Sequence, residues 1–206
     1  MTGVHITGCS ASASDRAVSE STERPASTGT PGKRVLLAYF SRAGENYSYG
    51  GRTDLEVGNT EVLARMIGER IECDLHRIKA VDPYPDDYDE TVARNVREQE
   101  ADARPAIANL PSSLERYDTV LLASPIWNVR APMIMSTFAE RFDFRGRTVF
   151  PITTYAMSGL GTTERDYAKS CPGATIGEGL AVQGEKVRDA DGAARSWLGR
   201  VGLLRE

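Results

Sequence analysis

Short strand-like runs alternate along the chain with segments of helical periodicity, and this alternation constrains the fold more than any other feature. The runs cover residues 35–40, 75–81, 117–124, 148–153 and 174–182, the last interrupted by Gly177 and Gly179. The first has the composition of a strand buried on both faces, whereas the second alternates like a strand near a sheet edge. We predict a three-layer α/β fold, with a doubly wound five-stranded parallel sheet in the order 2-1-3-4-5.

Helices are expected between these strands. The segment 86–102 is strongly charged and carries Tyr88, Val92 and Val96 at helical spacing, so we predict a solvated surface helix there. Further helices are expected from Pro132, over 163–170, and around Trp197 at the end of the chain.

Loops rich in polar residues and glycine follow the first, third and fourth predicted strands. In open parallel sheets of this order, ligands bind outside the carboxyl ends of the first and third strands. Because these loops leave carboxyl ends of strands, we expect them to meet at one rim. The sequence therefore predicts a ligand site at that rim.

The first of these loops has the features of an anion cradle. Ser41 and Arg42 end the first strand, and Gly58, Asn59 and Thr60 lead into an amphipathic helix. A helix N-terminus offers unpaired backbone N–H groups and the positive end of the dipole, so a phosphate monoester is expected there. The alternative is that the polar side chains merely cap the helix. For Arg42 we expect a solvated side chain, with charge neutralisation of the phosphate as the alternative.

The composition argues against several other classes of protein. A net charge of −4 and a pI near 5.4 argue against a general nucleic-acid binder, and no segment is long and apolar enough to span a membrane. Cys9, Cys73 and Cys171 form no CxxC pair, which argues against a zinc site or a disulfide framework. No GxSxG or GxxxxGK[ST] motif is present, and no aspartate ends the first or third strand as a phosphoacceptor receiver domain requires.

Residues 1–32 are rich in Ser, Thr and Ala, and we expect a disordered tail ahead of a single domain over 33–206. Ile6–Cys9 is similar to a lipoprotein cleavage box, but the apolar region that should precede such a box is absent. A cytoplasmic protein is therefore expected. A membrane-anchored lipoprotein is the alternative if the true start lies upstream.

Three groups of residues in register resemble the flavodoxin-like family of FMN-binding proteins. They are residues 38–42 with 58–60, residues 124–127, and residues 153–154 with 158–159. The likeness runs from Arg34 to the C-terminus. It implies a noncovalently bound FMN whose phosphate is held by the first loop and whose isoalloxazine ring is flanked by the other two. The cofactor-binding residues expected on this basis are Ser41, Arg42, Gly58, Asn59, Thr60, Pro125, Ile126, Trp127, Asn128, Thr153, Thr154, Tyr155, Ser158 and Gly159.

The ring-flanking loops carry specific expectations. Trp127 is expected to stack on a flavin face, or alternatively to pack against the next helix. The resemblance implies that a peptide in this loop flips to hydrogen-bond flavin N5 as the ring gains a proton. Asn128 tolerates the left-handed backbone conformation, so we expect it to support that flip. Thr153, Thr154, Tyr155, Ser158 and Gly159 are expected along the pyrimidine side, where glycine permits close backbone approach.

The chain departs from the common flavodoxin pattern within its phosphate loop. Residues 45–57 separate the two halves of that loop. Such long excursions are usually functional or disordered. Tyr47, Tyr49 and Arg52 would then cap the cofactor or contact a substrate.

Two functions share this predicted site. The first is an FMN-binding redox protein that transfers electrons to a protein partner or a small-molecule acceptor. The second is an FMN-dependent NAD(P)H:quinone or small-acceptor reductase. Both use the chemistry of the flavin.

Overall fold

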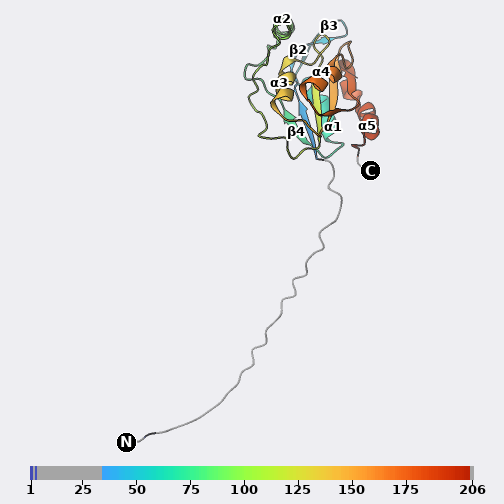
Figure 1. The fold of residues 1–206 in the computed structure, drawn as a ribbon. Helices are drawn as coiled ribbons and strands as arrows, with labels where there is room; N and C mark the ends of the chain where they lie inside the picture. Colours follow the sequence, from blue (N-terminus) through green and yellow to red (C-terminus); the bar gives the residue numbers. More distant parts are fainter. Residues whose placement is uncertain (2, 4–33, 205–206) are drawn as a thin grey trace. The chain divides into compact units, whose positions relative to one another are not determined.

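The computed structural model describes residues 1, 3 and 34–204. The expected tail and the Ile6–Cys9 motif lie outside the described residues, apart from positions 1 and 3. The domain is built on a wholly parallel sheet in the order β4-β1-β5-β6-β7, with β8 also pairing with β6 (Figure 1). The strands are β1 (Val35–Tyr39), β4 (Asp74–Arg77), β5 (Thr119–Pro125), β6 (Thr148–Tyr155), β7 (Thr175–Ile176) and β8 (Leu180–Gln183).

The predicted order 2-1-3-4-5 is confirmed, with the fifth strand in two pieces. β7 pairs with the beginning of β6 and β8 with its end. The break falls at the two expected glycines, and contacts on the sheet explain it. A Cβ on Gly177 would lie 2.2 Å from the Phe150 ring, and one on Gly179 would lie 2.7 Å from the Leu160 side chain. Neither position has room for a larger residue.

The residues of β1 alternate between two hydrophobic cores. Val35, Leu37 and Tyr39 belong to one cluster of buried side chains, whereas Leu36 and Ala38 belong to the other. Both sides of the strand are therefore covered, which explains its uninterrupted apolar sequence.

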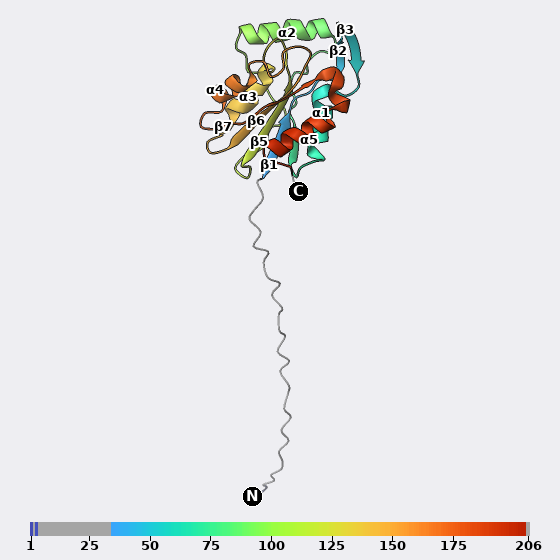
Figure 2. The same ribbon diagram turned by 90° about the vertical axis from the view of Figure 1, so that its right-hand side faces the viewer.

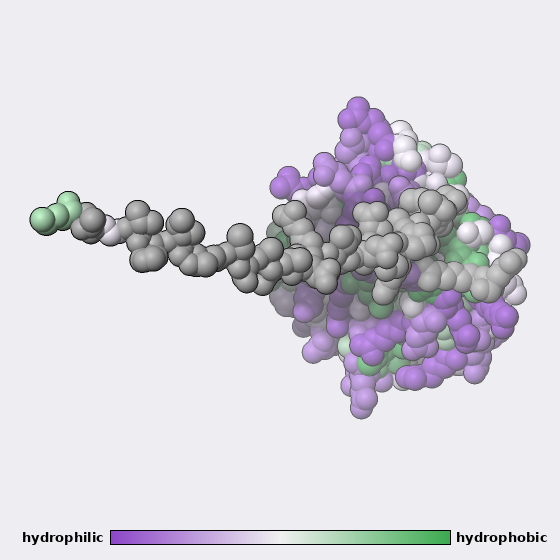
Figure 3. Space-filling model, turned by 90° about the horizontal axis from the view of Figure 1, so that it is seen from below, coloured by the Kyte–Doolittle hydropathy of each residue, from purple (hydrophilic) through white to green (hydrophobic). Residues whose placement is uncertain are grey.

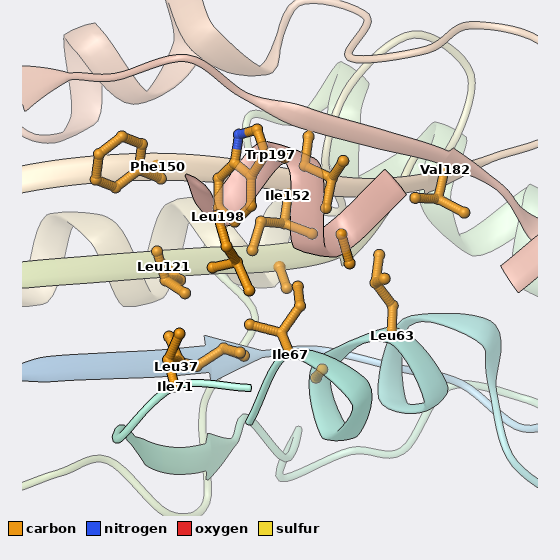
Figure 4. Close-up of a cluster of buried hydrophobic side chains, with 14 of the residues drawn as sticks. Leu37, Leu63, Ile67, Ile71, Leu121, Phe150, Ile152, Val182, Trp197 and Leu198 are labelled. Carbon is orange, nitrogen blue, oxygen red and sulfur yellow. The ribbon is translucent and has the colours of Figure 1, made fainter. Parts of the chain in front are cut away.

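One face of the sheet is covered by α1 (Asn59–Gly68) and α5 (Asp191–Arg200), with the 3₁₀-helix η1 (Gly184–Asp189) beside them. Leu63 and Ile67 of α1 and Trp197 of α5 belong to one cluster of buried side chains on this face (Figure 4). Trp197 is fully buried, and its indole N–H donates to the carbonyl of Glu178 at 2.9 Å. The last helix is thus held by both apolar contact and a hydrogen bond.

The opposite face is covered by α3 (Met133–Arg141) and α4 (Thr163–Ser170). Phe138 and Phe144 are fully buried in this second core. Pro132 occupies the N-cap of α3, and α4 has the bounds that the sequence predicted.

The helix α2 (Tyr88–Glu100) lies across the carboxyl-end rim of the sheet rather than on either face (Figure 2). The prediction of a solvated helix is wrong for one of its sides, because Thr91, Asn95 and Glu98 are buried. This buried stripe is polar because it meets hydrogen-bonding groups instead of an apolar core. Glu98, for example, accepts a hydrogen bond from the Tyr84 hydroxyl at 2.8 Å.

The inserted segment 45–57 forms most of a β-hairpin. Its strands are β2 (Gly44–Ser48) and β3 (Gly51–Leu55). Tyr49 and Gly50 make the turn with φ of 46° and 87°, the positive values that a type I′ turn requires at both positions. The pair Gly50–Gly51 after Tyr49 is the sequence signal for this hairpin.

The part of the surface that is visible at the amino end of the strands is mainly hydrophilic, with small separate apolar areas (Figure 3). Among the described residues, no helix has the length and apolar character needed to cross a membrane.

Candidate functional site

A cleft of about 840 Å³, counting the space open at its mouth, lies at the carboxyl-end rim. It is bounded by the loop after β1, the hairpin, α2, the loops after β5 and β6, and η1. The lining residues are Ser41, Arg42, Asn46, Tyr47, Asn59, Thr60, Tyr88, Thr91, Val92, Asn95, Pro125, Ile126, Trp127, Asn128, Thr154, Tyr155, Ala156, Gly184 and Glu185. The loops that the sequence predicted to converge do meet here.

The N-terminus of α1 opens on this cleft. Gly58 is its N-cap and supplies no side-chain cap. The cap comes from the first loop instead, because Ser41 Oγ accepts from the Glu61 N–H at 3.1 Å. The capping interpretation is therefore right for Ser41, whose hydroxyl hydrogen remains available as a donor. Within the described part of the chain, the N–H groups of Asn59 and Thr60 have no hydrogen-bond partner.

Gly58 is required by the closeness of the two halves of the loop. A Cβ at this position would lie 2.3 Å from the Arg42 carbonyl oxygen and 2.4 Å from Ser41 Oγ. Gly58 does not line the cleft itself. Its contribution is to let the helix N-terminus and the first loop share one small space.

Thr60 and Thr154 join the first loop to the loop after β6. Their hydroxyl oxygens lie 2.7 Å apart, and the residues are 1% and 4% exposed. One hydroxyl donates to the other, so the accepting hydroxyl keeps its own hydrogen for another group.

Arg42 is not solvated, and that prediction is wrong. Its guanidinium donates to the carbonyl oxygens of Pro85 and Asp86, each at 2.9 Å, and to that of Glu45. Burial lowers the pKa of Arg42, yet arginine remains charged in proteins. The side chain fastens the hairpin to the segment that leads into α2, and leaves a positive charge beside the cleft.

Trp127 packs in an aromatic cluster and also lines the cleft. Its ring centroid lies 5.7 Å from that of Phe40 and 5.1 Å from that of Tyr84, both in edge-to-face geometry. Trp127 thus packs on the rings of Phe40 and Tyr84, and its stacking on a flavin stays a prediction. Three more aromatic side chains line the cleft: Tyr47, Tyr88 and Tyr155.

Asn128 lies in a tight turn between Trp127 and Arg130. The Trp127 N–H donates to the Arg130 carbonyl at 2.9 Å, and Asn128 has φ of 58°. The backbone therefore adopts the left-handed conformation that asparagine tolerates. The Asn128 carbonyl accepts from Ser158 Oγ at 3.2 Å.

Residues 34–200 match the profile of a protein family described as Flavodoxin. The chain belongs to the flavodoxin family. The predicted family and fold are confirmed, and FMN is the cofactor of this family.

Solved structures agree with this membership. A putative flavoprotein of Bacteroides eggerthii is 28% identical with a TM-score of 0.66, over 82% of this chain and 98% of that one. A putative flavoprotein of Bacteroides uniformis is 27% identical with a TM-score of 0.64, over 82% and 99%. A flavoprotein of Lactobacillus acidophilus in complex with FMN, 17% identical with a TM-score of 0.56 over 76% and 97%, shares the fold. No curated protein is significantly similar to the chain.

Four of the predicted residues are not part of the cleft lining of this flavodoxin-family chain: Gly58, Thr153, Ser158 and Gly159. Thr153 is fully buried and its hydroxyl donates to the Gly159 carbonyl at 3.0 Å, which shapes the loop after β6. The other predicted residues all line the cleft.

Sequence reasoning missed the contributions of α2, η1 and part of the hairpin to this flavodoxin-family site. Thr91 and Asn95 are both buried on α2, and two polar residues four apart on a predicted helix were the available signal in the sequence. Gly184 lies against Asn59, because a Cβ on it would be 2.6 Å from Asn59 Nδ2. Glu185 accepts from the Tyr49 N–H at 2.9 Å, and so fastens the hairpin tip across the cleft mouth.

Proposed function

We propose that this chain is an FMN-dependent redox protein that transfers electrons through a flavin held noncovalently in the rim cleft. One observation carries the proposal: a single cleft contains both a helix N-terminus, whose first N–H groups have no partner among the described residues, and a lining of aromatic side chains. FMN has a phosphate monoester at one end and a planar aromatic ring at the other. The two ends of the cleft match these two chemistries.

At the phosphate end, we assign the N–H groups of Asn59 and Thr60 as donors to the phosphate oxygens. The hydroxyls of Ser41 and of the Thr60–Thr154 pair add donors, and the Asn59 amide adds another. Arg42 contributes positive charge while its two terminal Nη groups bind carbonyl oxygens. This end would hold a phosphate dianion without a lysine.

At the ring end, Trp127 provides an aromatic surface and excludes water from one side of the ring. The polar groups of Asn95 and Asn128 would orient the ring edge by hydrogen bonds. When bound, the flavin accepts two electrons and two protons and passes the electrons to an acceptor. The protein supplies position and surroundings.

A reductase is the second candidate, and two tyrosines that line the cleft favour it. A carrier needs an exposed ring edge, whereas a reductase needs a pocket above the ring for a nicotinamide donor and a small acceptor such as a quinone. Tyr47 of the hairpin and Tyr88 of α2 line the cleft. Such walls suit a small second substrate.

Turnover separates the two functions. The purified holoprotein is mixed with NADPH or NADH and a benzoquinone, and nicotinamide oxidation is followed. The carrier function predicts no sustained oxidation, but rapid transfer from the dithionite-reduced protein to an electron-accepting protein such as a cytochrome. Sustained oxidation that saturates with nicotinamide would instead establish the reductase.

The variant Thr60→Glu tests the phosphate end. A carboxylate there would repel the phosphate and fill its space, so we expect the purified variant to retain no FMN. The matched control is Thr137→Val on α3, at a residue that does not line the cleft, and it should retain FMN at the wild-type level. Equal FMN content in Thr60→Glu and wild type would contradict the assignment of the phosphate end.

A further inference from the structure

The side chain of Gln99 on α2 reaches the Trp127–Arg130 turn with both ends of its amide. Its Nε2 donates to the Trp127 carbonyl at 3.3 Å, and its Oε1 accepts from Asn128 Nδ2 at 3.4 Å. Nε2 also donates to Asn95 Oδ1 at 3.0 Å. Because a backbone carbonyl can only accept, the bond to Trp127 fixes which way the Gln99 amide faces.

Two consecutive carbonyl groups of the turn are therefore held by side chains from other elements. Gln99 of α2 holds that of Trp127, and Ser158 of the loop after β6 holds that of Asn128. By contrast, the N–H groups of Asn128 and Val129 have no partner within the described part of the chain. The N–H groups of the turn can therefore donate hydrogen bonds to a ligand, whereas the two carbonyl oxygens already accept hydrogen bonds from side chains.

The oxidation state of a flavin determines whether its N5 atom accepts a hydrogen bond from a neighbouring turn or donates one to it. In the oxidised ring, N5 has a lone pair and accepts a hydrogen bond. Complete reduction adds two electrons and two protons, one of them at N5, which then donates. A turn that meets the reduced ring must present a carbonyl, and here rotation of either carbonyl breaks a hydrogen bond to Gln99 or Ser158.

We propose that Gln99 is a positioning residue that holds this turn in the form suited to the oxidised flavin, and so lowers the reduction potential of the cofactor. This inference rests on the proposed function, because it requires FMN in the cleft. It assigns to α2 a role in tuning the flavin through the turn.

The test compares the variants Gln99→Leu and Ser158→Ala with wild type, each as full-length holoprotein. Leucine keeps most of the volume of glutamine and removes all of its hydrogen bonds. The one-electron midpoint potentials are measured by spectroelectrochemical titration at pH 7, with dithionite supplying the electrons and water the protons. The matched control is Ala93→Gln, a neutral change at an exposed position of the same helix.

We expect each variant to shift the reduction equilibrium about tenfold toward the reduced flavin. That corresponds to a rise of ~59 mV in a one-electron potential. The same shift should appear as tighter binding of reduced FMN relative to oxidised FMN. Ala93→Gln should leave the potentials at their wild-type values.

Unchanged potentials in a flavin-loaded Gln99→Leu protein would overturn the inference, as would potentials that fall. If Gln99→Leu does not fold, Ser158→Ala decides alone, and an unchanged potential there overturns the inference equally. A wild-type protein that binds no FMN would refute the proposed function and the inference with it. If the wild-type protein binds FMN but the variants have the same reduction potentials as wild type, only the inference is refuted.

Discussion

Gly58 shows how a single residue sets the geometry of the phosphate end. Its φ of −65° suits any amino acid, so the requirement for glycine is purely steric. Because a Cβ would overlap the backbone of Arg42 and the Ser41 hydroxyl, neither a rotamer change nor a small side-chain shift relieves the contact. The first loop and α1 would have to separate.

We therefore predict that Gly58→Ala destabilises the protein by ~1–3 kcal/mol, the range for overpacking, and weakens FMN binding at least tenfold. Urea unfolding and fluorescence titration with FMN measure the two effects. Gly199→Ala on α5 is the control, since nothing lies within 4 Å of its Cβ position. That change should stabilise the helix by ~0.5–1 kcal/mol and leave FMN affinity unchanged. Identical behaviour of the two variants would show that the close approach at Gly58 is absent.

His76 on β4 predicts a pH dependence of stability. Burial lowers its pKa below the ordinary value of 6.5, and among the described residues its Nε2 has no hydrogen-bond partner. Below pH 6.5 the unfolded chain therefore binds more protons at this residue than the folded chain does. The stability that neutral His76 contributes is fully present above pH 6.5 and is lost as the pH falls toward its lowered pKa.

The measurement is urea unfolding of wild type and His76→Gln between pH 5 and pH 8. We expect the free energy of unfolding of wild type to fall relative to the variant as the pH drops from 7 to 5. Parallel pH profiles would mean that His76 has the same pKa in both states.

At the scale of residues, local chemistry made Ser41, Asn59 and Thr60 predictable, because all three flank one strand-to-helix connection. The environment of Arg42 was not predictable in this way. Its acceptors at Pro85 and Asp86 lie more than 40 residues further along the chain, and only the fold brings them together. Charged side chains at loop positions are usually solvated, and here three converging carbonyl groups override that preference.

At the scale of elements, the hairpin β2–β3 is an addition at the rim that neither hydrophobic core requires. No hairpin residue belongs to either cluster of buried side chains. It is fastened to its surroundings at both ends, by the bond from the Glu45 N–H to the Asp86 carbonyl and by that from the Tyr49 N–H to Glu185. The hairpin therefore covers the cleft while the sheet folds without it.

Its removal is a direct test of this view. Gly44 and Leu55 are cross-strand partners, so residues 45–54 can be replaced by an Asn-Gly turn that joins them. We expect the shortened protein to fold and to lose FMN affinity about tenfold or more, because Asn46 and Tyr47 leave the cleft wall. Circular dichroism and FMN titration measure the two outcomes.

Tyr49→Asn is the matched control for the deletion. Tyr49 is 72% exposed at the turn, and asparagine suits its positive φ. FMN affinity should stay at the wild-type value. A shortened protein that binds FMN as tightly as the control would show that the hairpin does not cover the cofactor.

The helix α2 marks the limit of prediction from periodicity. Its apolar residues at 88, 92 and 96 predicted the helix correctly, but the side that is buried carries Thr91, Asn95 and Glu98. Hydrophobic periodicity reports which side meets an apolar core. A helix that lies on a rim above a polar cleft has no such core to face.

At the scale of the whole molecule, the sheet order followed from the sequence because strands alternate with helices along the chain and the central strands β1, β5 and β6 are apolar on both faces. The two hydrophobic cores account for the covering helices α1, α3, α4 and α5. The rim elements were predicted less well, since their positions depend on long-range polar contacts. The loops that leave β1, β5 and β6 nevertheless converge as their strand ends require.

The central claim is that these converging loops hold FMN, and the cofactor content of the purified full-length protein tests it most directly. The chromophore is released by denaturation, identified by chromatography and quantified per chain. We predict a yellow protein that carries FMN at one molecule per chain, or takes it up to that level when FMN is added. A colourless protein that takes up no added FMN would contradict the account.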